Sequence, residues 1–386
     1  MDVLITGSTG FLGGEILILL AKHPGVDRVF CLVRAGSEAD GLGRLRKVFG
    51  VHGDSLDTSR VIPVPGDLLD PALADRLQAD PRLKDIRWII HAAADTSFGK
   101  IHDDVVQKTN VEGLARFAAW AARLPRLDTF MYIGTASIIG KEAVNRVIRE
   151  DESPDPCATH LVRYTRTKME GEQLLQQILG PERLLVVRPS IIMGDSRGIK
   201  PRSFVILWAL AAADLLRLVP VDSGASLDAI PVDFAAEAII RLMGAQRRHT
   251  VYHISAGRGS ATTSRKLTDA IAVANPERPP FRFVDHRLMA EMKLWAKGRL
   301  FADADLFAYA AYLKYWDAIF PDRRKLRLTL AGFEPYSRFI NLSQVFDNAR
   351  LLDDAGIAPP EPAHSYISRN VAWLGTIDIM EGALDP

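Results

Sequence analysis

Residues 2–13 read DVLITGSTGFLG, an apolar run followed by a turn that contains three glycines. The run is typical of a buried strand, and the amphipathic segment Leu12–Lys22 after the turn predicts a helix. Glycine permits the tight turn and lets backbone amides approach a pyrophosphate, whose charge the helix N-terminus stabilises. The stretch therefore favours a dinucleotide-binding turn over an ordinary glycine turn. We expect its contacts to come from Gly7, Ser8, Thr9, Gly10, Phe11, Leu12 and Gly13.

The same rhythm of strand and helix continues through the first two thirds of the chain. Six apolar runs are typical of buried strands, and Val251–Ile254 adds a candidate seventh. The six runs are Val3–Ile5, Val29–Val33, Val61–Val64, Trp88–Ile90, Phe130–Ile133 and Leu184–Val187. Amphipathic segments at Val105–Arg123 and Leu161–Leu179 predict two further helices. The alternation predicts an α/β fold with a doubly wound, parallel Rossmann sheet.

The pattern changes after about Pro189, where proline and glycine interrupt the chain. From His286 to Phe320 it becomes helical and rich in aromatic residues. We expect a dinucleotide-binding Rossmann domain at residues 1–190, to which residues 229–256 return. Residues 191–228 and 257–386 are expected to form a smaller, mostly helical substrate-binding domain.

Charge and cysteine content exclude several classes of function. The 386 residues carry 48 basic and 47 acidic side chains, which gives no support for a nucleic-acid partner. The two cysteines, Cys31 and Cys157, fit no zinc spacing and suggest no disulfide scaffold, so we expect a cytoplasmic protein without a metal. A strand beginning at Asp2 leaves no room for a signal peptide. The apolar run from Phe204 to Ala213 is too short to span a bilayer.

The end of the second predicted strand indicates which dinucleotide binds. An NAD site would place an acidic residue there to hold the ribose 2′-hydroxyl, but residues 32–35 read LVRA. Arg34 can pair with a 2′-phosphate, and Arg44 or Arg46 could join it from the following helix. The sequence therefore favours NADPH over NAD as the cofactor. The alternative is that Arg34 is only a solvated charge at a strand end.

Three further segments follow strand ends and are expected to contact the cofactor. They are Asp67 and Leu68, the alanines Ala92, Ala93 and Ala94, and the pair Pro189 and Ser190. Asp67 is placed to accept a hydrogen bond from the adenine amino group, with an Asx turn as the alternative. The small alanines would let the ribose lie against the backbone, and the backbone of Pro189 and Ser190 could meet the nicotinamide carboxamide. His91, just before the alanines, is expected to be structural rather than catalytic.

Tyr164 and Lys168 are candidates for the reacting centre. Four residues apart, they lie on one face of a predicted helix. An ammonium beside a phenol favours the phenolate, so we expect Lys168 to lower the pKa of Tyr164. Tyr164 would then serve as a general acid near neutral pH, and Lys168 would also hold the ribose hydroxyls of the nicotinamide half. Both residues are therefore expected to contact the cofactor as well as to take part in catalysis.

Two further polar residues complete the predicted centre. Thr135 ends the fifth strand, where its hydroxyl can donate to a substrate carbonyl, and Ser137 is the rival donor. Asn110 lies within a predicted helix, where asparagine is a poor helix former. We expect Asn110 to bind a backbone group or to relay protons, with the structural role favoured.

Five stretches resemble the fatty acyl-CoA reductase and thioester reductase (male-sterility-like) group of the extended short-chain dehydrogenase/reductases. They are TGSTGFLG at 6–13, LVRA at 32–35, HAAA at 91–94, RPSIIMGDS at 188–196 and IPVD at 230–233. The resemblance implies NADPH-dependent reduction of an acyl thioester, carried by CoA or an acyl carrier protein, to an aldehyde or alcohol. It also implies the roles given above for Thr135, Tyr164, Lys168 and Arg34. A homodimer through helices at the sheet edge would be usual for the family.

Two other classes of function remain as alternatives. The first is a dehydrogenase or epimerase of the same large family, acting on a ketone, a hydroxyl group or a sugar nucleotide. The second is an NADP-binding regulator without catalysis, against which the presence of Thr135, Tyr164 and Lys168 together argues.

The second half of the chain offers hypotheses about the substrate. Leu288, Met292 and Trp295 recur at helical spacing, followed by aromatic residues within one long helical region. These aromatic residues are Phe301, Phe307, Tyr312, Tyr315 and Trp316. A core stripe is favoured over a lid for an alkyl chain, whose second wall would be the run from Phe204 to Ala213. Peripheral membrane contact is a third interpretation. The basic cluster Arg323–Arg327 is typical of a solvated face, with steering of CoA phosphates or a carrier protein as the alternative.

Overall fold

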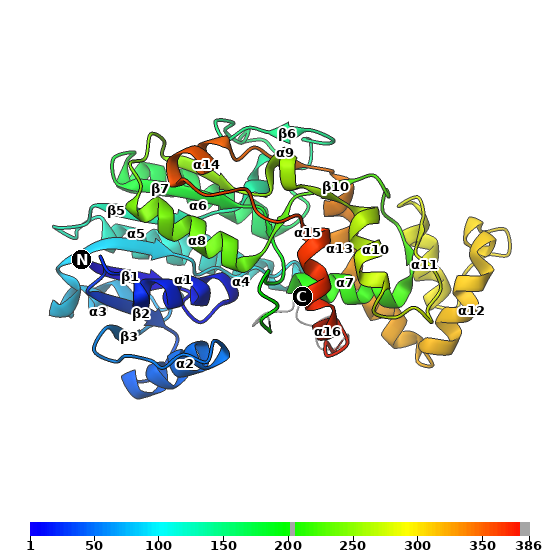
Figure 1. Cartoon of the computed structure of the whole chain (residues 1–386), viewed down its shortest axis with the longest axis horizontal. Coiled ribbons are helices and arrows are strands. Elements are labelled where there is room, and N and C mark those ends of the chain that lie inside the picture. The colour runs from blue at the N-terminus through cyan, green and yellow to red at the C-terminus, as the bar shows by residue number, and fades with distance from the viewer. Residues whose placement is uncertain (201–204, 379–386) are drawn as a thin grey trace.

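The computed structural model describes residues 1–200 and 205–378. Seven parallel strands form one sheet in the order β12-β7-β5-β4-β1-β2-β3 (Figure 1). The strands are β1 (Asp2–Thr6), β2 (Arg28–Val33), β3 (Val61–Pro65), β4 (Ile86–His91), β5 (Thr129–Ile133), β7 (Leu184–Pro189) and β12 (Val251–Ile254). All seven apolar runs that predicted strands lie in this sheet, which confirms the doubly wound α/β fold.

Helices cover both faces of the sheet because its strands are apolar on both sides. On β1, Val3 and Ile5 face one hydrophobic core and Leu4 faces the other. The first core is closed by α1 (Phe11–Lys22), α2 (Glu38–Val51), α8 (Val232–Gly244) and α14 (Ala349–Ala355). The second is closed by α3 (Leu73–Ala79), α5 (Leu114–Ala121) and α6 (Arg163–Leu179).

The direction of winding reverses between β1 and β4. The chain runs from β1 to β2 and β3 on one side and then returns to β4 on the other side of β1. Thr6 at the end of β1 pairs with His91 at the end of β4, so the loops after these two strands leave the same edge of the sheet. Ligands of open α/β sheets bind in the crevice at such a point.

The predicted helix at Val105–Arg123 is present but has a wider turn in its middle. It begins as α4 (Asp103–Gln107), continues through the π-helical turn η3 (Lys108–Gly113) and ends as α5. Asn110 lies in the π turn. Such turns are rare and occur frequently at functional sites.

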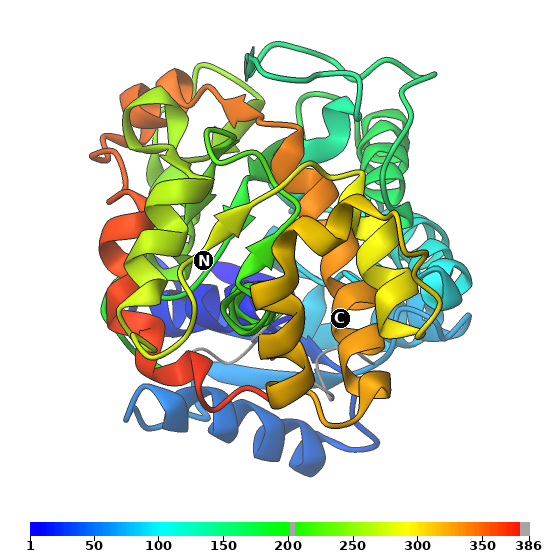
Figure 2. The same cartoon turned by 90° about the vertical axis from the view of Figure 1, so that its right-hand side faces the viewer.

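Helices from the second half of the chain gather at the carboxyl edge of the sheet, most of them to the right in Figure 1 and, for α11–α13, in front of the sheet in Figure 2. They are α7 (Val205–Leu216), α9 (Gly257–Ser260), α10 (Ser264–Ala272), α11 (Leu288–Ala296), α12 (Ala310–Ile319), α13 (Arg323–Asn341), α15 (Ala363–Tyr366) and α16 (Val371–Leu374). We call α7 and α10–α13 the helical layer. The division of the chain into two domains at the residues given above stays a prediction.

Pairs of two-residue strands tie this part of the chain together. They are β6 (Val147–Ile148) with β15 (Val345–Phe346), β8 (Ile191–Ile192) with β11 (Ala229–Ile230), β9 (Leu218–Val219) with β14 (Arg282–Phe283), and β10 (Ser226–Leu227) with β13 (Thr262–Thr263). The β6–β15 pair joins residues almost two hundred positions apart, so the loop before α6 is held by the C-terminal part of the chain.

The prediction of one long helical region from His286 to Phe320 is wrong. Helix α11 ends at Ala296, and Gly298 adopts a left-handed φ of 68° that an α-helix does not accept. A loop and the 3₁₀ turn η5 (Asp305–Tyr309) precede α12. Phe301 lies in this loop and is 72% exposed.

Helices α7 and α13 touch at one close contact. A Cβ atom on Gly332 of α13 would lie 2.6 Å from the ring of Trp208 on α7, so only glycine fits there. Trp208 also packs against Tyr336, four residues along α13, with 6.1 Å between the ring centroids. These contacts set the spacing of the two helices.

Candidate active site

A cavity of about 490 Å³ extends from the glycine turn after β1 to helices α7 and α13. This volume is within the range of small-molecule sites. The predicted site residues that line the cavity are Gly7, Thr9, Gly10, Phe11, Leu12, Gly13, Ala92, Ala94, Thr135, Tyr164, Lys168, Pro189 and Ser190. The fold therefore brings the glycine turn and the Tyr164/Lys168 pair to one cavity at the carboxyl edge of the sheet.

The glycine turn has the geometry that a dinucleotide requires. Gly7 adopts a φ of +72°, and a Cβ atom there would lie 2.6 Å from the amide nitrogen of Ala93. A Cβ on Gly13 would lie 2.1 Å from the carbonyl oxygen of Gly7. Gly10 caps α1 without a side chain, so no side chain of the cap residue stands between that helix N-terminus and a bound anion. These residues fit a pyrophosphate beside the turn.

Some predicted contacts of the turn and the strand ends lie behind the cavity wall. Ser8 is buried beneath the turn, and Leu68 packs in the core of α3, α5 and α6. The amide of Ala93 donates to Thr6 Oγ1 at 3.1 Å. Ser8, Leu68 and Ala93 do not line the cavity. The lining therefore does not support the direct contacts with a ligand that we expected for these three residues.

Arg34 and Arg44 lie together at the end of β2. Arg34 is exposed just after the strand, and Arg44 of α2 donates from Nη1 to the carbonyl oxygen of Arg34 at 2.5 Å. Arg46 is also exposed, but no hydrogen bond brings it to Arg34 in the part of the chain that the structure describes. The arrangement selects Arg44 over Arg46 as the neighbour of Arg34. Binding of a 2′-phosphate by this pair stays a prediction.

Asp67 forms the Asx turn that was the alternative to an adenine contact. Its Oδ1 atom accepts a hydrogen bond from the amide of Leu69 at 2.9 Å. This bond holds the loop between β3 and α3 and occupies one carboxylate oxygen.

Lys168 is buried on α6, with a side chain that is 3% exposed. Its Nζ atom donates to the carbonyl oxygen of Ile133 at 2.7 Å and lies 4.8 Å from the ring centroid of Tyr132. Both contacts favour the charged amine. Burial nevertheless lowers the pKa of Lys168 from 10.5 to about 7, because desolvation penalises the ammonium. At neutral pH the residue exchanges readily between its two protonation states.

The expectation of a lowered pKa for Tyr164 is wrong for this structure. Burial raises the pKa of the Tyr164 phenol above its ordinary value of 10, and no charge offsets this effect. A raised pKa keeps Tyr164 protonated at neutral pH, which is the form that a proton donor needs.

Thr135 and Ser137 both line the cavity. Thr135 Oγ1 lies 3.4 Å from the carbonyl oxygen of Pro189 and accepts from the amide of Ser137, also at 3.4 Å. These bonds are long, so the Thr135 hydroxyl can turn to a ligand. The two hydroxyl groups remain alternative donors.

The backbone of Ser190 is not free to donate to a ligand. Its amide donates to the carbonyl oxygen of Ile254 at 2.9 Å, which extends the pairing of β7 with β12. The expected contact of the backbone of Pro189 and Ser190 with a carboxamide therefore cannot use this amide, and for the other backbone atoms it stays a prediction. Both residues line the cavity.

Asn110 anchors two segments and does not line the cavity. Its Oδ1 atom accepts from the amide of Asp95 at 2.8 Å, and its Nδ2 atom donates to the Asp95 carbonyl at 2.9 Å and to Thr167 Oγ1 at 3.0 Å. These hydrogen bonds fit the structural role that the sequence favoured for Asn110. The π turn thus ties the loop after β4 to the residue that precedes Lys168.

His91 is structural, as expected. Its Nδ1 atom lies 3.0 Å from Thr6 Oγ1, and its ring stacks on Phe130. Burial lowers the pKa of His91 to about 3, so the imidazole stays neutral at physiological pH.

Aromatic residues that were not predicted from the sequence link the reacting centre to α13 of the helical layer. Phe98, in the loop that Asn110 holds, packs against Tyr164 with 6.2 Å between ring centroids. It also packs against Tyr336 and Phe339 of α13, at 5.3 and 5.4 Å. The apolar spacing of α13 is the signal in the sequence that could have indicated this helix as a wall.

The predicted core stripe is confirmed for Leu288, Met292, Trp295 and Trp316 but not for Phe301 and Phe307, which are exposed. The lid is only partly as expected. Leu288, Met292 and Trp295 are buried in the core of the helical layer. The cavity wall comes instead from α13 and from α7, which contains the apolar run predicted as a second wall. Phe204, the first residue of that run, lies outside the described residues.

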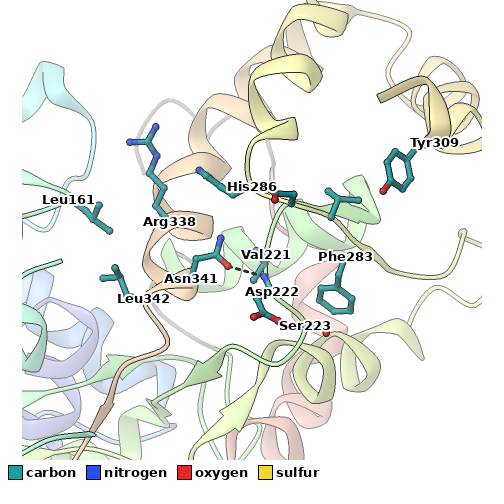
Figure 3. Close-up of a pocket in the computed structure, with 12 residues that line it drawn as sticks. Leu161, Val221, Asp222, Ser223, Phe283, His286, Tyr309, Arg338, Asn341 and Leu342 are labelled. Atoms are coloured by element: carbon teal, nitrogen blue, oxygen red, sulfur yellow. Dashed lines mark hydrogen bonds between the residues drawn. The ribbon is translucent and has the colours of Figure 1, made fainter. Parts of the chain in front are cut away.

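A second hollow of about 800 Å³ lies on the other side of α13 (Figure 3). Arg338, Asn341 and Leu342 line it, whereas Tyr336, Phe339 and Ile340 line the first cavity. Asn341 accepts from the amide of Asp222 at 2.8 Å across this hollow. Helix α13 therefore forms a wall of both spaces.

Within residues 1–200 and 205–378 no helix has the length and apolar character to cross a bilayer. No group of three or more His, Cys, Asp or Glu side chains there is placed to hold a metal ion.

Comparisons with known proteins identify relatives of this chain. A family model described as male sterility protein matches residues 5–239. A linear gramicidin synthase of Brevibacillus parabrevis is 32% identical over 248 residues, which are 62% of this chain and 5% of that protein. Fatty acyl-CoA reductase 2, chloroplastic, of Arabidopsis thaliana is 30% identical over 172 residues, 40% of this chain and 27% of that protein. This chain thus spans only a small part of either relative.

A solved structure agrees with the fold. The terminal R domain from the myxalamid PKS-NRPS biosynthetic pathway aligns with a TM-score of 0.74 and 22% identity, over 97% of this chain and 90% of that one. Fold and glycine turn together define an extended short-chain dehydrogenase/reductase with an NAD(P)-binding domain. More narrowly, this chain belongs to the male sterility protein family, in the thioester reductase branch of that class.

Proposed function

We propose that this protein reduces an acyl thioester, carried by CoA or an acyl carrier protein, with NADPH as the hydride donor. The observation that carries the proposal is one cavity that joins the glycine turn, the Tyr164/Lys168 pair and an apolar helical wall. Residues 191–228 and 257–386 would then form the substrate-binding part.

The side chains at the cavity take distinct roles in this reaction. Bound NADPH supplies the hydride for the thioester carbonyl carbon. Tyr164 donates its proton to the carbonyl oxygen, and Thr135 or Ser137 donates a hydrogen bond to the same oxygen as charge develops. Lys168 holds the ribose hydroxyls. When charged, it also stabilises the phenolate that Tyr164 becomes after it has donated its proton. The resulting hemithioacetal releases the thiol, which takes the hydroxyl proton, and leaves an aldehyde.

The lining of the cavity favours a lipid-like substrate over a sugar nucleotide. Where the cavity meets the helical layer, it is lined by aliphatic and aromatic side chains from α7 and α13, such as Leu210 and Phe339. A sugar needs several polar partners, and a buried polar group without one costs about 1–3 kcal/mol. These walls therefore lack the polar groups that the sugar of an epimerase substrate would need.

NADPH is favoured because two arginines and no acidic residue lie at the end of β2. Arg34 and Arg44 offer guanidinium groups that suit a phosphate. The relatives' names support the thioester part, because they include a fatty acyl-CoA reductase and a linear gramicidin synthase.

The test is oxidation of NADPH by purified protein with dodecanoyl-CoA and with the same acyl group on a carrier protein. We expect turnover with at least one of them. Tyr164→Phe should lower kcat by about 100-fold or more while the Kd for NADPH stays within about threefold, because only the proton donor is lost. Tyr315→Phe is the control, since the Tyr315 hydroxyl is buried with no hydrogen-bond partner among the described residues and the residue lies outside the cavity. Absence of turnover with both thioesters, or a normal rate in Tyr164→Phe, would contradict the proposal.

A further inference from the structure

The end of the cavity that adjoins the helical layer is apolar apart from the hydroxyl group of Tyr336. Its walls come from α7, α13 and two leucines of β10 and α10, and none of these side chains is charged. They are Ile206, Leu207, Ala209, Leu210, Leu227, Leu267, Tyr336, Phe339 and Ile340. Lys168, the basic residue of the cavity, lies at the other end, next to the sheet. A ligand that fills the helical end must therefore present an uncharged, apolar group there.

The width of this end is fixed by the helices themselves. Gly332 of α13 lies against the Trp208 ring, so α7 and α13 cannot come closer at that point. Tyr336 follows Gly332 by four residues and faces the cavity from the same side of α13. The cavity thus begins one helical turn beyond the place where the two helices touch.

Ala209 is the smallest of the α7 side chains at the wall. It follows Trp208 directly and lies between Ile206 and Leu210, which also line the cavity. Alanine ends at its Cβ atom, so a larger side chain at position 209 would add atoms to this wall of the cavity.

We propose that Ala209 determines the length of acyl chain that this protein accepts, with the chain lying between α7 and α13. The inference rests on the proposed thioester reduction, because it assigns the acyl part of that substrate to the helical end. A larger residue at position 209 occupies space that belongs to the ligand.

The experiment compares dodecanoyl-CoA with butanoyl-CoA for the wild type, Ala209→Val and Ala209→Leu. We expect the ratio of kcat/KM for the long chain to kcat/KM for the short chain to fall about 10-fold in Ala209→Val and about 100-fold in Ala209→Leu, since each excluded methylene costs about 10-fold or more. Ala290→Leu is the control, because it makes the same substitution at an exposed position of α11 outside the cavity. Its ratio should equal that of the wild type.

Binding separates this inference from the proposed reaction. Titration of both acyl-CoAs into protein saturated with NADP⁺ measures Kd without turnover, and the same change in ratio is expected. If the wild type binds dodecanoyl-CoA but never oxidises NADPH, the proposed reaction is contradicted. The assignment of the acyl site is then decided by the Kd ratios of the variants alone. Ratios within twofold of the wild type in both variants would overturn the assignment of Ala209. Failure of both variants to fold would place Ala209 in packed core and would overturn it as well.

Discussion

Replacing Lys168 with methionine should stabilise the protein while abolishing its proposed activity. Burial lowers the pKa of Lys168 from 10.5 to about 7, and each pKa unit is worth about 1.36 kcal/mol, so holding the ammonium in the fold costs about 5 kcal/mol. The variant loses the hydrogen bond to the Ile133 carbonyl, worth about 1 kcal/mol. The net gain is about 4 kcal/mol at pH 6. With an unfolding entropy of about 2.1 cal/mol/K per residue, this raises Tm by about 5 °C.

The pH dependence of this gain identifies its cause. Below pH 7 the lysine is charged in both the folded and the unfolded chain, and the whole cost of burial is present. Between pH 7 and 10.5 the folded protein holds a neutral amine while the unfolded chain still binds the proton, so the cost falls as pH rises. At pH 9 about 2 kcal/mol of the cost remains, and the expected gain in Tm is about 1 °C.

Differential scanning calorimetry of the protein without added cofactor, at pH 6 and pH 9, measures both differences. Lys47→Met, at an exposed position of α2, is the matched control and should change Tm by less than about 1 °C at either pH. A Lys168→Met variant that melts below the wild type at pH 6, or a gain that is equal at both pH values, would refute the reasoning.

Three other substitutions test the cofactor site and its support. In steady-state kinetics, Arg34→Ala should raise the KM for NADPH about tenfold or more and leave the KM for NADH unchanged. The control Arg46→Ala should change neither KM. Equal effects of Arg34→Ala on both cofactors would exclude a 2′-phosphate contact. Gly13→Ala should abolish NADPH binding in calorimetric titration, because its Cβ meets the Gly7 carbonyl at 2.1 Å, while Gly43→Ala, in open space on α2, binds normally. Asn110→Ala should lower the free energy of unfolding in urea by about 1–3 kcal/mol, since it leaves the Asp95 amide without its acceptor, and a variant as stable as the wild type would show that the anchor is dispensable.

The sequence predicts the sheet well because the signals are local. Each strand of a parallel sheet that is covered on both faces is a continuous apolar run, such as Val29–Val33 within β2. The glycine turn and the Tyr164/Lys168 pair are local as well, since each is set by a few residues of one loop or helix. The residues of these two motifs that line the cavity could therefore be predicted without coordinates.

Contacts between distant segments could not be predicted in the same way. Phe98 meets Tyr336 and Phe339 from more than two hundred residues away, and nothing in its own segment indicates these partners. The amide of Ser190 is lost to Ile254 because a strand far along the chain pairs with β7. Such partners depend on the tertiary fold rather than on local pattern.

The protonation of the reacting pair also depends on burial. The sequence places an amine one helical turn from Tyr164 but does not tell how much water reaches either group. The fold removes that water, and desolvation then raises the pKa of Tyr164 and lowers that of Lys168. The direction of both changes follows from the environment and not from the spacing of the two residues.

The contact of Gly332 with Trp208 has a practical consequence for engineering. This contact fixes the spacing of α7 and α13, so neighbouring residues that line the cavity can be substituted without bringing the two helices closer together. A mutant library aimed at new acyl groups should keep these two positions constant and diversify the cavity-facing residues around Ala209. Because both helices belong to the part of the chain that follows the Tyr164/Lys168 helix, such a library would broaden the range of substrates while leaving the hydride-transfer machinery untouched.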